Sequence, residues 1–246
     1  MKRNLKMIVE YNGAGYHGWQ RQKNAASIQQ LLEEKIGIIT REEIKIVGAG
    51  RTDTGVHAIN QVANFKTESK IEETRLRHGI NSLLPKDVAV KHILEVEGVF
   101  HARYDVKSKI YLYQIYNEPI RSVMYKDYSW FIRQPLDTER MRAALILLKG
   151  THDFSSFSAA DKDITNRVRT VMDVNLINAR CGMIKIYIEA EGFLRYMVRN
   201  IVGTLVDVGM GKLSTTEFMN LIAMKDRRLA GVKAPPQGLF LMEVKY

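Results

Sequence analysis

The feature that most restricts the fold of this chain is the order in which two hydrophobic periods follow one another. Residues 4–11 alternate between apolar and polar side chains as a strand does, and residues 27–39 carry an apolar stripe at helical spacing. Ser27 and Gln30 predict a capping box at the start of this helix. The patterns that follow read strand, strand, helix and strand, at residues 43–49, 58–67, 72–84 and 87–97. The order is β-α-β-β-α-β, which is the ferredoxin-like unit.

The rest of the chain repeats this order. Its patterns predict a strand, a helix ending at Gly150, a hairpin, an apolar helix and a final strand, at residues 106–117, 137–150, 167–192, 193–209 and 238–246. A hairpin-like stretch at 122–132 and a short helix at 214–225 interrupt the repeat. We therefore predict an α+β protein with two ferredoxin-like halves, residues 1–104 and 105–246, joined into a large, mostly antiparallel sheet with helices on one side. The alternative is an ordinary α+β domain without a true repeat.

Composition narrows the partners and the compartment. The chain of 246 residues has a net charge of +10, from 37 Lys and Arg against 27 Asp and Glu, which suggests a polyanionic partner such as nucleic acid. The alternative is a charged surface that serves only solubility. Cys181 is the only cysteine, so neither an intrachain disulfide nor a cysteine zinc site can form, as is typical of the reducing cytoplasm. No apolar run approaches a membrane span, and no signal peptide is recognisable at the start. We expect a soluble, cytoplasmic protein that contacts no membrane.

The stretch GAGRTDTGVHA, Gly48–Ala58, is the strongest candidate for chemistry. Its glycines allow backbone conformations closed to other residues, and its centre holds Asp53 close to Arg51. An adjacent arginine would keep the carboxylate ionised, ready to act as a nucleophile or a general base. The alternatives are that Asp53 only forms a turn and that His57, a possible acid or base, is structural.

Motifs of several enzyme classes are missing from the sequence. It contains neither a phosphate-binding P-loop nor a dinucleotide-binding glycine pattern, and neither a GxSxG elbow nor a zinc deaminase signature. Its histidines show no HExxH spacing or other metal pattern. We therefore expect a site that uses no cofactor and no metal, with Asp53 as its prominent carboxylate.

The quoted loop resembles the signature of the tRNA pseudouridine synthase A family. The segments YNGAGYHGWQRQ, FHARYDVKSKIYLYQIYN, THDFSSF, FLRYMVRNIVGTLVDVG and GLFLMEVKY also resemble family segments, in the same order and over nearly the whole chain. The resemblance implies the pseudouridine synthase fold and a cofactor-free isomerisation of uridine to pseudouridine. It implies nucleotides 38, 39 and 40 of the tRNA anticodon stem-loop as substrate and a homodimer as the acting form.

The resemblance also assigns roles to residues. Asp53 matches the catalytic aspartate, and Arg199 matches the basic residue that pairs with it. Tyr111 matches the tyrosine that packs against the target uracil, and Arg51 matches an arginine that handles the RNA and the flipped base. One departure is Ile110, which stands where family members usually carry an arginine before the tyrosine. It removes any arginine contact from this strand position.

Two questions stay open at the level of sequence. Asp53 could attack C1′ of the ribose or remove the C2′ proton to give a glycal. The protein could also be a non-catalytic basic RNA-binding protein of the same fold.

Arg195 and Arg199 are four residues apart, which predicts that they share one helical face. The other candidates for an RNA-binding surface are Arg21, Lys23, Arg103, Lys107, Lys109, Arg167 and Arg169.

Overall fold

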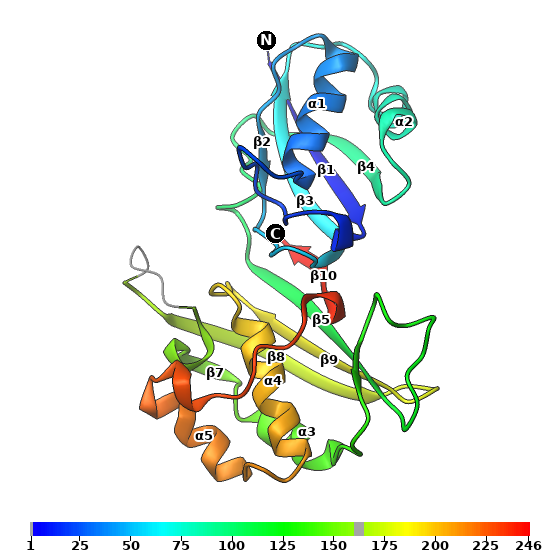
Figure 1. The fold of residues 1–246 in the computed structure, drawn as a ribbon. Helices are drawn as coiled ribbons and strands as arrows, with labels where there is room; N and C mark the ends of the chain where they lie inside the picture. The colour runs from blue at the N-terminus through cyan, green and yellow to red at the C-terminus, as the bar shows by residue number, and fades with distance from the viewer. Residues whose placement is uncertain (1, 160–164) are drawn as a thin grey trace. The chain divides into compact units, whose positions relative to one another are not determined.

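The computed structural model describes residues 2–159 and 165–246, and these residues form two units (Figure 1). The N-terminal unit comprises Met1–Lys107 together with Phe240–Tyr246, and the C-terminal unit comprises Ser108–Leu239. The sequence patterns predict a boundary between residues 104 and 105 and place the final strand in the second half. In the structure Phe240–Tyr246 groups with the first unit instead, because Phe240 and Leu241 pair with the third strand of that unit.

The N-terminal unit has the predicted β-α-β-β-α-β order and gains one strand from the far end of the sequence. Its central strands lie in the order β4-β1-β3, and β1 is antiparallel to both neighbours. On the other side of β3, β2 pairs antiparallel with one end, at Phe65, and β10 pairs parallel with the other end, at His57. The elements are β1 (Arg3–Tyr11), α1 (Ile28–Thr40), β2 (Ile46–Gly48), β3 (His57–Thr67), α2 (Glu73–Leu83), β4 (Val88–Val96) and β10 (Leu239–Lys245).

Alternating side chains of β1 and the apolar stripes of both helices build the core of this unit. Leu5, Met7 and Val9 are fully buried, in agreement with the strand period. Helix α1 begins as predicted, with the Ser27 hydroxyl accepting the Gln30 amide. The predicted capping box is only half formed, because the Gln30 side chain donates to Glu34 instead.

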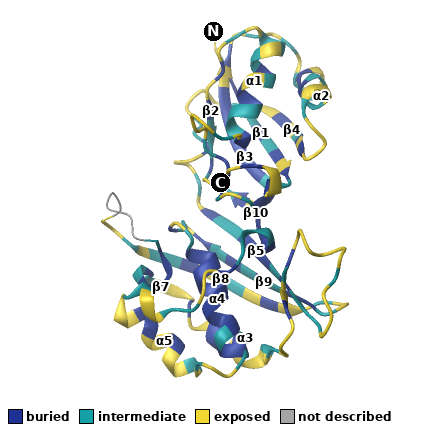
Figure 2. Cartoon of the chain, in the orientation of Figure 1, coloured by how far each residue is buried: buried dark blue, intermediate teal, exposed yellow. Residues whose placement is uncertain are grey.

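The C-terminal unit carries its strands in the order β5-β9-β8-β7, with helices α3, α4 and α5 packed together. Strands β8 and β9 form the predicted antiparallel hairpin, and β5 pairs antiparallel with β9. The helix α4 is buried along nearly its whole length (Figure 2). The elements are β5 (Ser108–Asn117), β6 (Trp130–Ile132), α3 (Thr138–Ile146), β7 (Gly150–Asp153), β8 (Val168–Asn178), β9 (Met183–Ala190), α4 (Met197–Gly209) and α5 (Thr215–Met224).

Three local expectations for this unit were wrong. Residues 122–132 form no hairpin but contribute only β6, which runs parallel to β5. Helix α3 ends at Ile146, and Gly150, with φ +104°, opens β7 instead of capping the helix. Helix α4 begins at Met197, not at residue 193, because Tyr196 takes the left-handed conformation at φ 65° and ends the irregular segment before it. Arg195 therefore lies outside the helix that carries Arg199.

None of the helices formed by the described residues is both long enough and apolar enough to cross a bilayer.

Candidate active site

The loop that carries Asp53 is held by backbone hydrogen bonds to the first glycine-rich loop of the chain. The Trp19 amide donates to the Thr52 carbonyl at 3.1 Å, and the Gly55 amide donates to the Tyr16 carbonyl at 3.3 Å. Within the loop, the Val56 amide donates to the Asp53 carbonyl at 3.1 Å and closes a tight turn. Asp53 is therefore part of a turn, and its backbone is also fixed by a second segment.

Two glycines of the first loop make this close approach possible. A β-carbon at Gly18 would lie 2.4 Å from the Thr52 carbonyl oxygen, and Gly18 also has a φ of +87°. A β-carbon at Gly13 would lie 2.0 Å from the Val56 carbonyl oxygen. Side chains at these positions would push the two loops apart, so the glycines bring backbone against backbone on both sides of Asp53.

A hydrogen bond between two buried side-chain hydroxyls supports the same loop. The Tyr11 and Thr52 hydroxyls are 2.8 Å apart, and burial raises the pKa of Tyr11 to about 12. The side-chain amide of Gln61 donates to the Gly50 carbonyl at 3.0 Å, which fixes the start of the same loop. The Thr52 side chain thus serves to anchor the loop through Tyr11 at the end of β1.

His57 has a structural environment. It is buried, its Nδ1 accepts the Gly13 amide at 3.1 Å, and its ring stacks on Phe240 at 4.8 Å between centroids. A nitrogen that accepts a backbone N–H carries no proton, so this geometry requires a neutral ring. His57 therefore joins β10 and the first loop to the end of the Asp53 loop.

Arg51 does not form the ion pair that its place in the sequence suggested. Its side chain is exposed, and no hydrogen bond or ion pair joins it to any residue that the structure describes. Asp53 is half-buried two residues away. Closeness in the sequence thus does not make Arg51 the group that holds the carboxylate ionised, and its guanidinium is open to solvent.

Arg199 is buried in the C-terminal unit, and both its side chain and its backbone are hydrogen-bonded to Ala234. Only 6% of Arg199 is exposed, its Nε donates to the Ala234 carbonyl at 2.7 Å, and its own carbonyl accepts the Ala234 amide at 3.1 Å. The next residue, Pro235, accepts the Tyr113 hydroxyl at 2.8 Å. Burial raises the pKa of Tyr113, and the positive charge of Arg199 partly offsets that rise. The arginine is therefore a preorganised, buried cation.

Tyr111 lies on the helix-facing side of β5. It pairs with Ile188 across the β5–β9 ladder, and its ring meets Phe193 edge-on at 4.9 Å. Ile110, Leu112 and their alternate neighbours point to the other face of the sheet, as the strand period predicted. Of the four predicted site residues, the structure thus places Asp53 and Arg51 on one loop of the N-terminal unit, and Tyr111 and Arg199 in the C-terminal unit.

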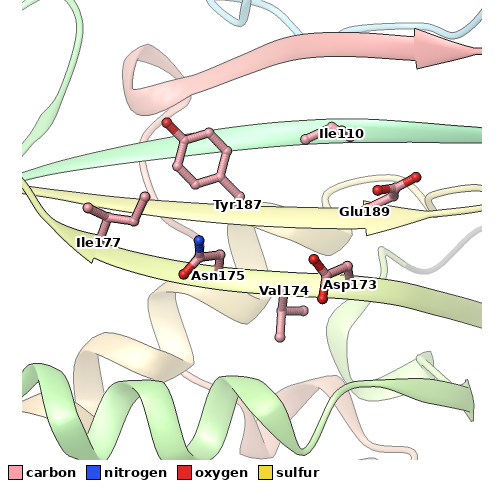
Figure 3. Close-up of a pocket in the computed structure, with 7 residues that line it drawn as sticks. All are labelled: Ile110, Asp173, Val174, Asn175, Ile177, Tyr187 and Glu189. Atoms are coloured by element: carbon pink, nitrogen blue, oxygen red, sulfur yellow. The ribbon is translucent and has the colours of Figure 1, made fainter.

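A hollow of about 240 Å³ opens on the outer face of the C-terminal sheet (Figure 3). Strands β5, β8 and β9 line it with Ile110, Asp173, Val174, Asn175, Ile177, Tyr187 and Glu189. It contains none of the predicted site residues, and Ile110 marks the face of β5 opposite Tyr111. The hollow is therefore separate from the predicted chemistry.

The segment around Ala234 was not anticipated from the sequence, although it binds both Arg199 and Tyr113. It packs onto α4 so closely that a β-carbon at Gly203 would lie 1.6 Å from the Val232 carbonyl oxygen. The Gly231 amide also donates to the Thr204 hydroxyl at 3.0 Å. The small residue pair Gly203–Thr204, inside an otherwise bulky apolar helix, is the one signal in the sequence that could have indicated a backbone contact here.

The sequence is similar to known proteins along nearly its whole length. A family model described as tRNA pseudouridine synthase matches residues 7–105 and 144–246. Proteins named tRNA pseudouridine synthase A are 48% identical to this chain in Thermoanaerobacter sp. strain X514 and 44% identical in Acetivibrio thermocellus. Each of these two alignments covers 99% of this chain and the whole of the relative.

Among solved structures, the archaeal box H/ACA sRNP Nop10–Cbf5 complex is similar at 13% identity with a TM-score of 0.37. That alignment covers 80% of this chain and 45% of the other chain. The assignment depends on the family model and the full-length relatives, not on this distant likeness. The chain belongs to the tRNA pseudouridine synthase family.

Proposed function

We propose that this protein isomerises uridine to pseudouridine at nucleotides 38, 39 and 40 of the tRNA anticodon stem-loop, with Asp53 as the reacting carboxylate. Membership of the family makes it an isomerase that acts on tRNA uridine. The observation that carries the assignment to Asp53 is the bracing of its loop, in which Gly13 and Gly18 bring a second backbone segment against both flanks. A carboxylate on a loop fixed in this way can meet a substrate with little loss of conformational freedom.

Asp53 has two routes to the same product. As a nucleophile, its carboxylate bonds to C1′ while the C1′–N1 bond breaks and uracil departs with the electron pair; C5 then attacks C1′ and releases the carboxylate. As a base, it removes the C2′ proton while uracil departs and leaves a C1′=C2′ double bond, and it returns the proton when C5 attacks. In both routes C5 then loses its proton and N1 gains one, so the net change is an isomerisation that consumes no oxidant or reductant.

The other predicted residues support this carboxylate. Arg199 pairs with Asp53 and keeps it ionised, a role suited to a buried arginine that its neighbours hold in place. Tyr111 packs against the detached uracil while it turns. Arg51 is exposed and without a protein partner in the described structure, so its guanidinium can bind the RNA near the extruded nucleotide.

Recognition of the stem-loop depends on shape and on phosphate contacts, which a net charge of +10 favours. Several of the candidate basic residues already have protein partners, among them Arg169, which donates to the Val168 carbonyl at 2.6 Å. Arg21 pairs with Glu33 at 3.0 Å, and Arg167 donates to the Ser158 hydroxyl at 2.6 Å. We also propose that the protein acts as a homodimer in the cytoplasm. Sedimentation of the purified protein, alone and with tRNA, tests the dimer.

The decisive experiment compares Asp53→Asn with the wild type in pseudouridine mapping and in tRNA binding. Asparagine keeps the shape of the side chain and removes its charge, so we expect activity to fall roughly 10⁴-fold or more while tRNA binding persists. Asp53→Ala should behave in the same way. Asp127→Asn, which changes an exposed aspartate of the C-terminal unit, is the matched control and should keep full activity.

The same experiment separates the enzyme from the alternative. A non-catalytic RNA-binding protein has no use for a carboxylate that faces phosphates, so Asp53→Asn would leave its binding unchanged or tighten it, and the wild type would make no pseudouridine. Pseudouridine formation that survives in Asp53→Asn would show that a different residue performs the chemistry.

A further inference from the structure

The ring of Tyr196 is surrounded by three cations. The guanidinium carbons of Arg195 and Arg199 lie 4.8 and 5.4 Å from its centroid, and the Lys233 ammonium lies 4.1 Å away. The Arg195 Nη2 also donates to the Tyr196 hydroxyl at 2.9 Å. All four residues belong to the C-terminal unit, and we refer to them as the Tyr196 cluster.

Irregular backbone, not helical periodicity, brings these residues together. Tyr196 has a φ of 65°, which is uncommon for a bulky residue, and this turn sets Arg195 before the helix and Arg199 in its first turn. Lys233 belongs to the same segment as Ala234, whose carbonyl binds Arg199. This segment packs against α4 at Gly203. The positions of the cations are therefore fixed by packing within one unit.

Two of the three cations, Arg195 and Lys233, have no acidic partner in the part of the chain that the structure describes. Both side chains are exposed. Each contact with the ring is a weak interaction at an exposed position. The cations repel one another, so an anion bound between them would be stabilised by both charges at once.

We infer that Arg195 and Lys233 bind a phosphate of the substrate RNA backbone, and that Tyr196 positions both cations for it. This inference rests on the proposed function, because it takes the anion to be a phosphodiester next to the nucleotide that meets Asp53 and Arg199. Arginine offers a planar fork and lysine a point charge, and both are established phosphate ligands. The Tyr196 ring holds the two side chains in place and makes no contact with the phosphate itself.

The experiment measures KM, kcat and the salt dependence of binding with an anticodon stem-loop RNA. For the double variant Arg195→Ala/Lys233→Ala we expect KM to rise about tenfold with kcat within twofold of wild type. The slope of log K against log salt should fall by about 0.7 to 0.9 for each cation removed. Tyr196→Leu should raise KM less than the double variant, and Tyr196→Phe should stay near wild type because the ring remains. Arg140→Ala, which removes an exposed arginine paired with Asp137 on α3, is the control and should change neither slope nor KM.

Inorganic phosphate at constant ionic strength distinguishes a general phosphate site from an RNA site. We expect it to inhibit the wild type more than the double variant. A double variant with unchanged KM and salt slope overturns the inference even when the wild type is fully active, and so does a site that binds free phosphate without any effect on RNA. A wild type without isomerase activity overturns the proposed function instead, and the salt slope of RNA binding still tests the cluster.

Discussion

The loop around Asp53 and the segment that holds Arg199 both fix a charged side chain, but they do so in different ways. Each holds a charged side chain by pressing one backbone segment against another: the first loop against residues 52–56, and residues 231–235 against α4. In the N-terminal unit, several glycines clustered in two loops indicate the contact in the sequence. In the C-terminal unit, the contact depends on Gly203, a single glycine inside a helix, and the sequence gives little indication of it. Such a backbone contact can thus be recognised from the sequence when its glycines are concentrated in loops, and it is missed when it depends on one glycine inside a helix.

The largest effect is expected from Gly203→Ala. The new β-carbon would meet the Val232 carbonyl oxygen at 1.6 Å, so the segment must move, and Arg199 loses its bonds to Ala234. We expect a loss of about 3 to 4 kcal/mol in the free energy of unfolding, with a fall in kcat. Denaturant unfolding and steady-state kinetics measure both. Gly79→Ala, inside α2 and near only the Ile39 side chain, is the control and should cost under about 1 kcal/mol.

A somewhat smaller effect is expected from Gly18→Ala in the N-terminal unit. The β-carbon would lie 2.4 Å from the Thr52 carbonyl oxygen, at a φ of +87° that alanine tolerates poorly. We expect a loss of about 2 to 3 kcal/mol and a lower kcat, because the Asp53 loop is displaced. Gly98→Ala is the control, because a β-carbon placed at Gly98 would meet nothing within 4 Å, and it should leave stability and activity intact. If Gly18→Ala proved equally harmless, the first loop would not be what holds Asp53.

The smallest effect concerns the hydroxyl of Tyr11 and appears as a dependence on pH. Burial raises the pKa of Tyr11 to about 12, so the folded state holds this proton more tightly than the unfolded state, whose tyrosines ionise near 10. The resulting stabilisation, roughly 2 to 3 kcal/mol, is complete below pH 10 and is lost as the pH rises from 10 towards 12.

Tyr11→Phe removes this titration and the bond to the Thr52 hydroxyl. At neutral pH the variant should be about 1 kcal/mol less stable than the wild type, and the difference should shrink or reverse above pH 10. Urea unfolding at a series of pH values measures it, with Tyr104→Phe, at an exposed tyrosine, as the control. A gap between wild type and Tyr11→Phe that stays constant from pH 7 to pH 12 would contradict the buried environment of Tyr11.

Much of the fold could be predicted because the hydrophobic period is a local property. The order of elements through Val96, the β8–β9 hairpin and the short helix α5 all agree with the sequence patterns. The start of α4 could not be predicted, because the apolar pattern continues through residues 193–196 while tertiary packing holds Tyr196 in a left-handed turn. Arg195 and Arg199 still meet, at the ring of Tyr196 and not on a shared helical face.

The candidate site divides in the same way. The Asp53 loop was recognisable from its glycines and its resemblance to a family signature, and the structure adds its anchor on Tyr11 and its brace from the first loop. Arg51 was expected beside Asp53 as an ion-pair partner, and the structure leaves it open to solvent. The catalytic roles of Asp53, Arg199, Tyr111 and Arg51 stay predictions that the variants above can test.

The pairing of Phe240 with His57 has a consequence for biosynthesis. On the ribosome, Phe240–Tyr246 is made only after the whole of Ser108–Leu239, so the β3 edge next to the Asp53 loop stays open while the second unit is being translated. The second unit can thus begin to fold while the first still lacks a strand. A nascent chain that stalls before residue 240 would present an uncovered strand edge to other chains, which favours aggregation over a partly active product.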